Sequence, residues 1–201
     1  MAEPTFQFDA GSLCLDFANA LAARLEPPAD PVLAYADLVA WAVQAGVLAP
    51  GQGQRLLERA RREREKAAAA VRRAAELRAA IFLAFARIAE GQPPDAEGLG
   101  AINRLLAEAL PHLHLRPGEA RCRWEWLVPE GTVDQMLWPV VRSAADLLTS
   151  ERVERVRECA SETCSWLFLD GSRNGRRKWC DMASCGNRAK ARRYYERHHR
   201  G

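Results

Sequence analysis

Apolar residues recur at helical intervals through the first half of the chain. One occurs at every fourth position from Leu13 to Leu25, which predicts a helix that ends at the two following prolines. A second helix is predicted over residues 33–45. Ahead of both, Phe6 and Phe8 alternate with polar neighbours and predict a short strand.

The segment 52–90 is rich in Ala, Leu, Arg and Glu and contains no proline, so it predicts one long helix or two consecutive ones. Its first half carries charges of both signs, which is typical of a solvated helix face rather than a nucleic-acid site. Asp95 is expected to cap a further helix with Ile102, Leu106 and Leu110 on its apolar side.

The period then changes from helical to alternating. HLHLRPGEARCRWEWL alternates on both sides of Pro117-Gly118 and predicts a β-hairpin, and Leu137–Leu148 predicts another amphipathic helix. The fold class that follows is α+β, with a mostly helical domain over residues 1–150 that contains one small hairpin.

Charge is distributed unevenly along the chain. The whole chain has a net charge of +3, but residues 1–150 carry −3 and residues 151–201 carry +6. A nucleic-acid-facing end on a near-neutral body has this asymmetry, and so does a solvated basic tail. No secretory signal is visible and no apolar run approaches a membrane span of roughly 20 residues, so we expect a cytoplasmic protein without a membrane partner.

The six cysteines divide into two lone residues and a cluster of four. Cys14 and Cys122 stand among apolar or alternating residues and are expected to be small buried hydrophobes. Disulfides are not expected, because cytosolic thiols stay reduced and a chain of this length needs no staples.

The clustered cysteines form two close pairs, Cys159-x4-Cys164 and Cys180-x4-Cys185, separated by fifteen residues. Four thiolates on two tight loops can close a tetrahedron around one zinc ion and leave no open position for substrate water, so the predicted site is structural. Between the pairs, Trp166–Asp170 and Arg177–Cys180 are expected to form a hairpin. With good helix formers after Cys185, residues 151–201 predict a treble-clef-like zinc finger.

Basic residues surround this predicted finger. On a helix that begins near Cys185, Arg188, Arg192 and Tyr195 share one face, and four basic residues surround the expected hairpin turn. The charges of four thiolates and one zinc ion sum to −2, and this negative site would itself attract cations. The basic residues could therefore form a solvated or protein-facing surface instead of a nucleic-acid site. The candidate nucleic-acid contacts are Arg173, Arg176, Arg177, Lys178, Arg188, Lys190, Arg192 and Arg193.

The segment CSWLFLDGSRNGRRKWCDMASCGNRAKARR resembles the CGNR zinc finger, which is named after the run from Cys185 to Arg188. Upstream, SLCLDFANAL is similar to the Leu-Asp-Phe-x-Asn signature of the ABATE domain, and YADLVAWAVQAGVL resembles the Asp-Leu-x-x-Trp helix that follows it. The resemblance covers nearly the whole chain. It implies a stress-induced bacterial transcription regulator with a DNA-binding finger.

Asp16 and Asn19 are the polar part of that upstream signature. Three positions apart on an apolar helix, they either face a ligand pocket together or satisfy backbone groups where the helix packs, and we favour the structural role. Residues 1–150 otherwise show no nucleophile with a base, no phosphate-cradling glycine loop and no open metal site, so we do not expect an enzyme.

The leading hypothesis is a transcription regulator whose finger contacts duplex DNA. Its helical domain would then sense a small-molecule effector, form a homodimer or bind a partner protein. A zinc-stabilised protein-interaction module is the first alternative. An RNA-binding protein is the second, with Trp179, Tyr194 or Tyr195 stacking on unpaired bases, although these aromatic residues fit packing within the finger better.

Overall fold

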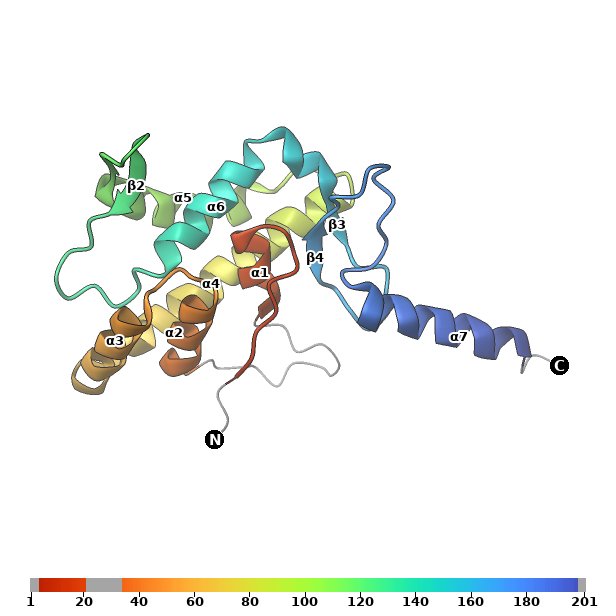
Figure 1. Ribbon diagram of the computed structural model, residues 1–201, viewed down its shortest axis with the longest axis horizontal. Coiled ribbons are helices and arrows are strands. Elements are labelled where there is room, and N and C mark those ends of the chain that lie inside the picture. The colour runs from red at the N-terminus through yellow and green to blue at the C-terminus, as the bar shows by residue number, and fades with distance from the viewer. Residues whose placement is uncertain (1–3, 21–33, 199–201) are drawn as a thin grey trace.

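A computed structural model describes residues 4–20 and 34–198 and shows two small antiparallel sheets among helices (Figure 1). The predicted α+β class is confirmed. The elements in chain order are α1 (Leu13–Ala20), α2 (Tyr35–Gln44), α3 (Pro50–Arg62), α4 (Arg64–Ala89), α5 (Ala96–Ala109), η1 (Leu110–His112), β1 (Leu113–Arg116), β2 (Arg123–Trp126), α6 (Leu137–Leu148), η2 (Glu151–Arg155), β3 (Val156–Glu158), β4 (Leu167–Leu169), η3 (Met182–Gly186) and α7 (Asn187–His198).

The short helix α1 lies at the centre of the main core. It contacts α4, α6 and β4, and every residue from Cys14 to Asn19 is buried. On its α2 side the ring of Phe17 meets that of Trp41 edge-on, with centroids 4.9 Å apart. An apolar helix that is covered on nearly all sides anchors the segments around it, and these include β4 of the finger.

The helices largely follow the predicted periodicity. The 52–90 segment forms two helices, because Glu63 leaves helical geometry (φ −115°, ψ 56°) between α3 and α4. Asp95 caps α5 as predicted, with its Oδ1 accepting a hydrogen bond from the Gly98 amide at 2.6 Å. The second half of the first predicted helix and the start of the second fall within residues 21–33 and lie outside the described residues.

The strand predicted at Phe6 and Phe8 is wrong, because residues 4–9 form no strand. The Phe6 amide donates to the side-chain Oε1 of Gln44 at 3.2 Å, and Gln44 Nε2 donates back to the Pro4 carbonyl at 2.8 Å. A glutamine side chain of α2 therefore bonds to the backbone of this segment at Pro4 and Phe6. Its alternating pattern reflects packing of the phenylalanines against the core rather than sheet pairing.

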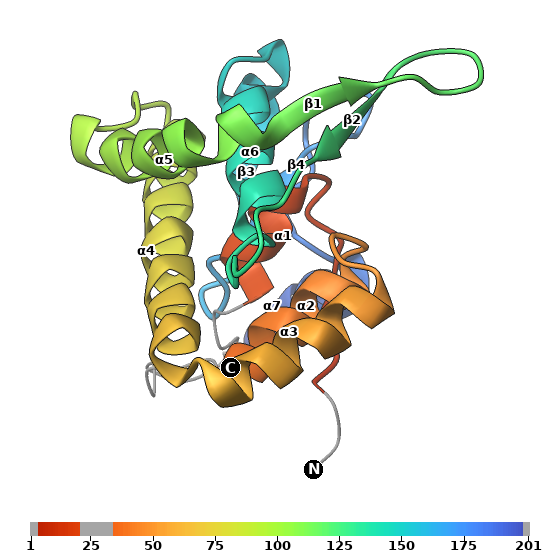
Figure 2. The ribbon, with the colours of Figure 1, turned by 90° about the vertical axis from the view of Figure 1, so that its left-hand side faces the viewer.

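The predicted hairpin is present as β1 and β2, with Leu113 opposite Trp126 and Leu115 opposite Trp124. It extends away from the helices (Figure 2), so Leu115 and Trp124 are exposed. Cys14 is buried as predicted. The prediction for Cys122 is wrong, because it lies in the exposed turn before β2 and not on the packed side of the hairpin.

The hairpin predicted between the two cysteine pairs is also wrong. Strand β4 pairs with β3, upstream of the first cysteine, and not with residues 177–180. Those residues contribute one backbone bond to the first loop, from the Ala160 amide to the Lys178 carbonyl at 2.9 Å. The first cysteine pair thus lies on the turn that joins β3 to β4.

Strand β4 separates two hydrophobic clusters. Leu167 and Leu169 belong to the main core, whereas Phe168 and its neighbour Trp166 pack with the four clustered cysteines. Alternate side chains of a strand point to opposite faces, so one three-residue strand serves both clusters. Beyond the cysteine cluster, α7 projects away from the remaining helices (Figure 1). Among the described helices, none is long and apolar enough to cross a membrane.

Candidate metal centre

The four clustered cysteines bring their sulfur atoms together. All four thiols are buried, and their Sγ atoms lie within 4.8 Å of one another. The Cys180 sulfur is 3.7 Å from that of Cys164 and 3.6 Å from that of Cys185. A tetrahedral zinc ion with bonds of about 2.3 Å requires sulfur atoms roughly 3.8 Å apart, so the donor set and its spacing fit one zinc ion.

Local contacts within the cluster set the acidity of its thiols. The hydrogen bond between Cys164 and Cys180 lowers the pKa of Cys164, and the same contact, with burial, raises the pKa of Cys180. Outside the cluster, Arg188 Nη2 donates to Cys185 Sγ at 3.2 Å, and this contact raises the pKa of the guanidinium. Zinc and four thiolates carry −2, so Arg188 neutralises part of the charge that the site would hold.

Each residue of the Cys-Gly-Asn-Arg run has a visible structural role. Cys185 is a candidate ligand, and Arg188 donates to it. Gly186 is buried, and a Cβ there would come within 2.7 Å of the Met182 sulfur. Its φ angle is not positive, so what a larger residue would meet here is the Met182 side chain and the Trp179 ring, at 3.3 Å, and not backbone strain. Asn187 Nδ2 donates to the Ala183 carbonyl at 3.1 Å and closes η3.

Two aspartates that the site prediction omitted organise the loops around the metal centre. Asp181 caps η3 by accepting hydrogen bonds from the amides of Ala183 and Ser184. Asp170 is fully buried and accepts from the Ser172 amide at 2.8 Å and the Arg177 amide at 2.9 Å. Burial opposes ionisation of Asp170, but these hydrogen bonds outweigh it and lower its pKa. Asp-Gly-Ser and Asp-x-x-Ser are turn and cap patterns that sequence reasoning could have used.

Arg177, predicted as a nucleic-acid contact, is directed into the finger. Its guanidinium lies 4.6 Å from the centroid of the Phe168 ring. Its Nε donates to the Trp179 carbonyl at 2.9 Å, and its Nη2 donates to the Cys180 carbonyl. The side chain thereby links the 170–177 loop to the second cysteine pair.

The two arginines predicted to share one face of α7 also contact the finger near the start of the helix. Arg192 forms an ion pair with Glu162 on the first cysteine loop, next to the contact of Arg188 with Cys185. The two arginines line a hollow of about 440 Å³ between that loop and α7, together with Trp179. Arg188 thereby connects the start of α7 to the cysteine cluster, and Arg192 adds an exposed ion pair beside it.

The remaining predicted contacts are directed outward where the structure describes them. Arg173, Arg176 and Lys178 are exposed on the loop before Cys180, and Lys190 is exposed on α7. Arg193 lies in α7, but its side chain is outside the described part of the structure. Arg197, which the prediction left out, is exposed on the last turn of α7 and belongs to the basic run already visible in the sequence.

The three aromatic candidates differ in their surroundings. Trp179 is half-buried against the cysteine cluster, as expected for packing. Packing within the finger was the wrong expectation for Tyr194 and Tyr195, which are 61% and 64% exposed. Tyr194 stacks on His198 of the same helix, with centroids 4.1 Å apart. A helix that projects from the body has no core of its own in which to bury them.

Asp16 and Asn19 both bond to backbone groups. The amide side chain of Asn19 donates to the Leu167 carbonyl at 2.8 Å and accepts from the Leu167 amide at 3.0 Å, as a neighbouring strand would. Asp16 accepts from the Ala10 amide at 2.9 Å. These contacts fit the structural role that we favoured from the sequence, in which the two polar side chains satisfy backbone groups around α1.

Comparison with known proteins identifies two family models along the chain. The model described as "ABATE: Putative stress-induced transcription regulator" matches residues 11–151, and the CGNR zinc finger model matches residues 155–198. A search of curated proteins finds no match. The cysteine geometry and the second family model together support one structural zinc ion held by Cys159, Cys164, Cys180 and Cys185.

Proposed function

Because the chain belongs to the ABATE family and ends in a CGNR zinc finger, we propose that it is a transcription regulator that binds duplex DNA through the finger. The observation that carries the proposal is the position of α7. This helix holds five Arg or Lys residues and one Glu, and it projects from the body on a base fixed by the metal centre (Figure 1).

The proposed contact surface combines α7 with the loop before Cys180. Lys190 and Arg197 on the helix are exposed, as are Arg173, Arg176 and Lys178 on the loop. Exposed cations on rigid supports suit phosphate contacts, which position a protein on DNA, and arginine can also read guanine edges. Arg177 would support this surface from behind. Arg188 and Arg192 contact Cys185 and Glu162 but are themselves exposed, so they remain candidate DNA contacts at the base of α7.

The helical domain would be the regulatory part of the molecule, through an effector, a partner protein or a second copy of the chain. In this proposed role the protein has no catalytic activity and acts in the cytoplasm, where bacterial DNA is accessible. Four reduced thiols held as metal ligands are consistent with that compartment.

Binding to a labelled random-sequence duplex tests the proposal on the zinc-loaded full chain. Replacing Lys190 and Arg197 together by Gln should weaken binding about tenfold. The slope of log affinity against log salt concentration should also become shallower, by the amount expected for the loss of roughly two phosphate contacts. The control, with Arg61 and Arg64 replaced by Gln, removes the same charge from exposed positions at the other end of the molecule and should bind as wild type. Equal affinities of the two variants would contradict the assigned surface.

The exposed tyrosines favour single-stranded nucleic acid as a second candidate partner. Tyr194 and Tyr195 present their rings beside the basic residues of α7, and aromatic rings stack on unpaired bases. A labelled single strand of the same length, measured beside the duplex, separates the two candidates. Replacing both tyrosines by Leu should weaken single-strand binding selectively if stacking contributes.

A further inference from the structure

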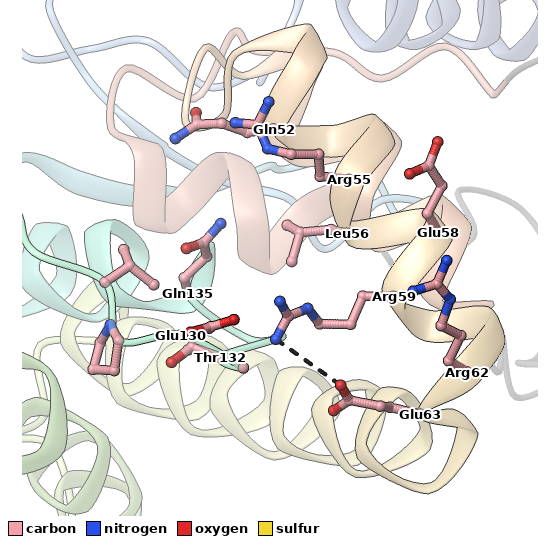
Figure 3. A pocket seen from close by; sticks show the side chains of 13 residues that line it. Gln52, Arg55, Leu56, Glu58, Arg59, Arg62, Glu63, Glu130, Thr132 and Gln135 are labelled. Carbon is pink, nitrogen blue, oxygen red and sulfur yellow. Dashed lines mark ion pairs between the residues drawn. The ribbon is translucent and has the colours of Figure 1, made fainter.

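A polar hollow of about 550 Å³ lies at the opposite end of the molecule from α7, between α3 and the loop 128–135. Its volume is within the range of small-molecule sites. Three arginines of α3 line one wall, namely Arg55, Arg59 and Arg62. Figure 3 shows Arg59 reaching from the helix toward Glu130 and Thr132 on the loop.

Both walls of this hollow are fixed to the body. On the loop side, Tyr35 Oη donates to the Val133 carbonyl at 2.6 Å, and Arg73 pairs with Asp134 at 2.9 Å. On the helix side, Gly53 lies so close to α2 that a Cβ there would approach Val43 to 2.8 Å. A wall that is already in place loses little conformational freedom when a ligand binds.

The arginines form a row along the helix. Their spacing of four and three residues places them on one face, and the row extends about 10 Å along the axis at 1.5 Å per residue. Within the described part of the chain, Arg55 and Arg62 have no ion-pair partner, and both are exposed. A row of this length suits a ligand with more than one anionic group.

Three glutamates also line the hollow, but within the described part of the chain none of them forms an ion pair with Arg55 or Arg62. Glu63 pairs with Lys66 at 2.7 Å and more distantly with Arg59 at 3.9 Å, so its charge is already balanced. Glu58 extends away from the loop in Figure 3. Glu130 faces the hollow from the opposite wall, where its exposed side chain can turn into solvent.

The turn that carries Glu130 also brings backbone close to the central arginine. The Thr132 amide donates to the Pro129 carbonyl at 3.3 Å, and Gly131 at the third position has φ +88°, which favours glycine there. A Cβ at Gly131 would lie 3.4 Å from Arg59 Nη1. The turn thus confines the guanidinium at the middle of the row.

From this arrangement we propose that the hollow binds a small organic anion carrying at least two phosphate or carboxylate groups, with Arg59 at the centre of the site. The site is formed by the N-terminal domain alone, so binding there does not depend on the proposed DNA contact. Its ligand would be the effector through which this domain regulates the finger.

Calorimetric titration of the zinc-loaded full chain tests the site with two probes, fructose 1,6-bisphosphate and glutarate, at constant ionic strength. We expect saturable binding of at least one probe, and the probe that binds distinguishes phosphate from carboxylate chemistry. Arg59→Gln should weaken that binding at least tenfold. Arg61→Gln, on the same helix but outside the lining, should bind as wild type.

Should Arg59→Gln fold poorly through loss of its Glu63 pair, the double variant Arg55→Gln and Arg62→Gln removes two exposed lining charges and should give the same loss. Absence of saturable binding for both probes would overturn the proposal, as would equal binding by the Arg59→Gln and Arg61→Gln variants. Because the readout is heat of ligand binding, this failure is distinct from a failure to bind DNA.

Discussion

Arg177 connects three parts of the finger through one side chain. Its guanidinium stacks on Phe168 of β4 and donates to the carbonyls of Trp179 and Cys180. Lysine carries the same charge but has neither the flat stacking surface nor the two fixed donors. Charge alone therefore does not describe what this position contributes.

We predict that Arg177→Lys destabilises the zinc-loaded protein by about 1–2 kcal/mol, because a stacked contact and at least one hydrogen bond to a half-buried carbonyl are lost. The variant should also release zinc at a lower chelator concentration. Its exposed neighbour supplies the matched control, since Arg176→Lys should change stability by less than about 0.5 kcal/mol. Indistinguishable unfolding curves and zinc release for the two variants would refute this role.

Asp16 is a buried carboxyl whose burial raises its pKa to about 6. An unfolded aspartate titrates near 4, so between about pH 4 and pH 6 the folded state binds more protons than the unfolded state. Stability contributed by this group is therefore present at low pH and is lost as the pH rises through about 6. Asparagine has no such titration and keeps an oxygen that can accept from the Ala10 amide.

Asp16→Asn should consequently gain on the order of 2 kcal/mol in unfolding free energy relative to wild type between pH 4 and pH 7. Urea unfolding of both proteins across this range measures the difference. Asp146→Asn, at a side chain 69% exposed, should show a much smaller change. If the difference in unfolding free energy between Asp16→Asn and wild type did not change with pH, Asp16 would not have the raised pKa that this prediction assumes.

At the scale of elements, β4 connects the metal centre to the helical domain. Leu167 and Leu169 pack into the main core, Asn19 bonds to both backbone groups of Leu167, and Phe168 faces the cysteines. Among the described residues beyond Asp170, the buried hydrophobic ones pack in the cysteine cluster and none belongs to the main core. Metal binding should therefore stabilise this last segment most strongly.

Chelation of zinc, or Cys180→Ser, is predicted to abolish hydrogen-exchange protection over residues 171–198 while α1 and α4 stay protected. Strand β4 should keep partial protection through its packing on the main core. Mass spectrometry of peptide fragments resolves these regions, and Cys122→Ser, at an exposed thiol outside the cluster, should retain zinc and full protection. Simultaneous loss of protection in all segments would instead mean that the metal supports one cooperative unit.

The same elements show what sequence reasoning could and could not provide. The period of apolar residues was sufficient for α6 and the β1–β2 hairpin, because each has an extended face that repeats. Alternation also indicated β4, but not its partner, since β3 is only three residues long and lies in a charged segment. Pairing depends on the long-range burial of Leu167 and Leu169, which local pattern does not contain.

Spacing likewise revealed the four cysteines but not the direction of the arginines. Helical periodicity placed Arg188 and Arg192 on one face of α7 without indicating whether that face meets solvent or the finger. In the structure both side chains are exposed, and they also contact Cys185 and Glu162 on the loops that hold the cysteines. Charge attraction to the thiolates was foreseeable, but its geometry required the folded loops.

At the scale of the whole molecule, basic side chains gather at two opposite ends. The α7 end presents a basic helix and loop, and the opposite end presents a hollow lined by a row of arginines (Figures 1 and 3). Between them lies a core in which α1 contacts α4, α6 and β4. In the proposed regulator, this core would lie between the proposed DNA-binding surface and the proposed anion site.

The central claim, that the finger brings this chain to DNA, is tested most directly by selecting genomic fragments. Zinc-loaded full-length protein is incubated with sheared bacterial DNA at near-physiological salt, and the retained fragments are sequenced. The Lys190→Gln, Arg197→Gln variant serves as the comparison. We predict retention by wild type, strongly reduced for the variant, with a recurrent motif among the fragments. Absence of retention by folded, zinc-loaded wild type would contradict the account.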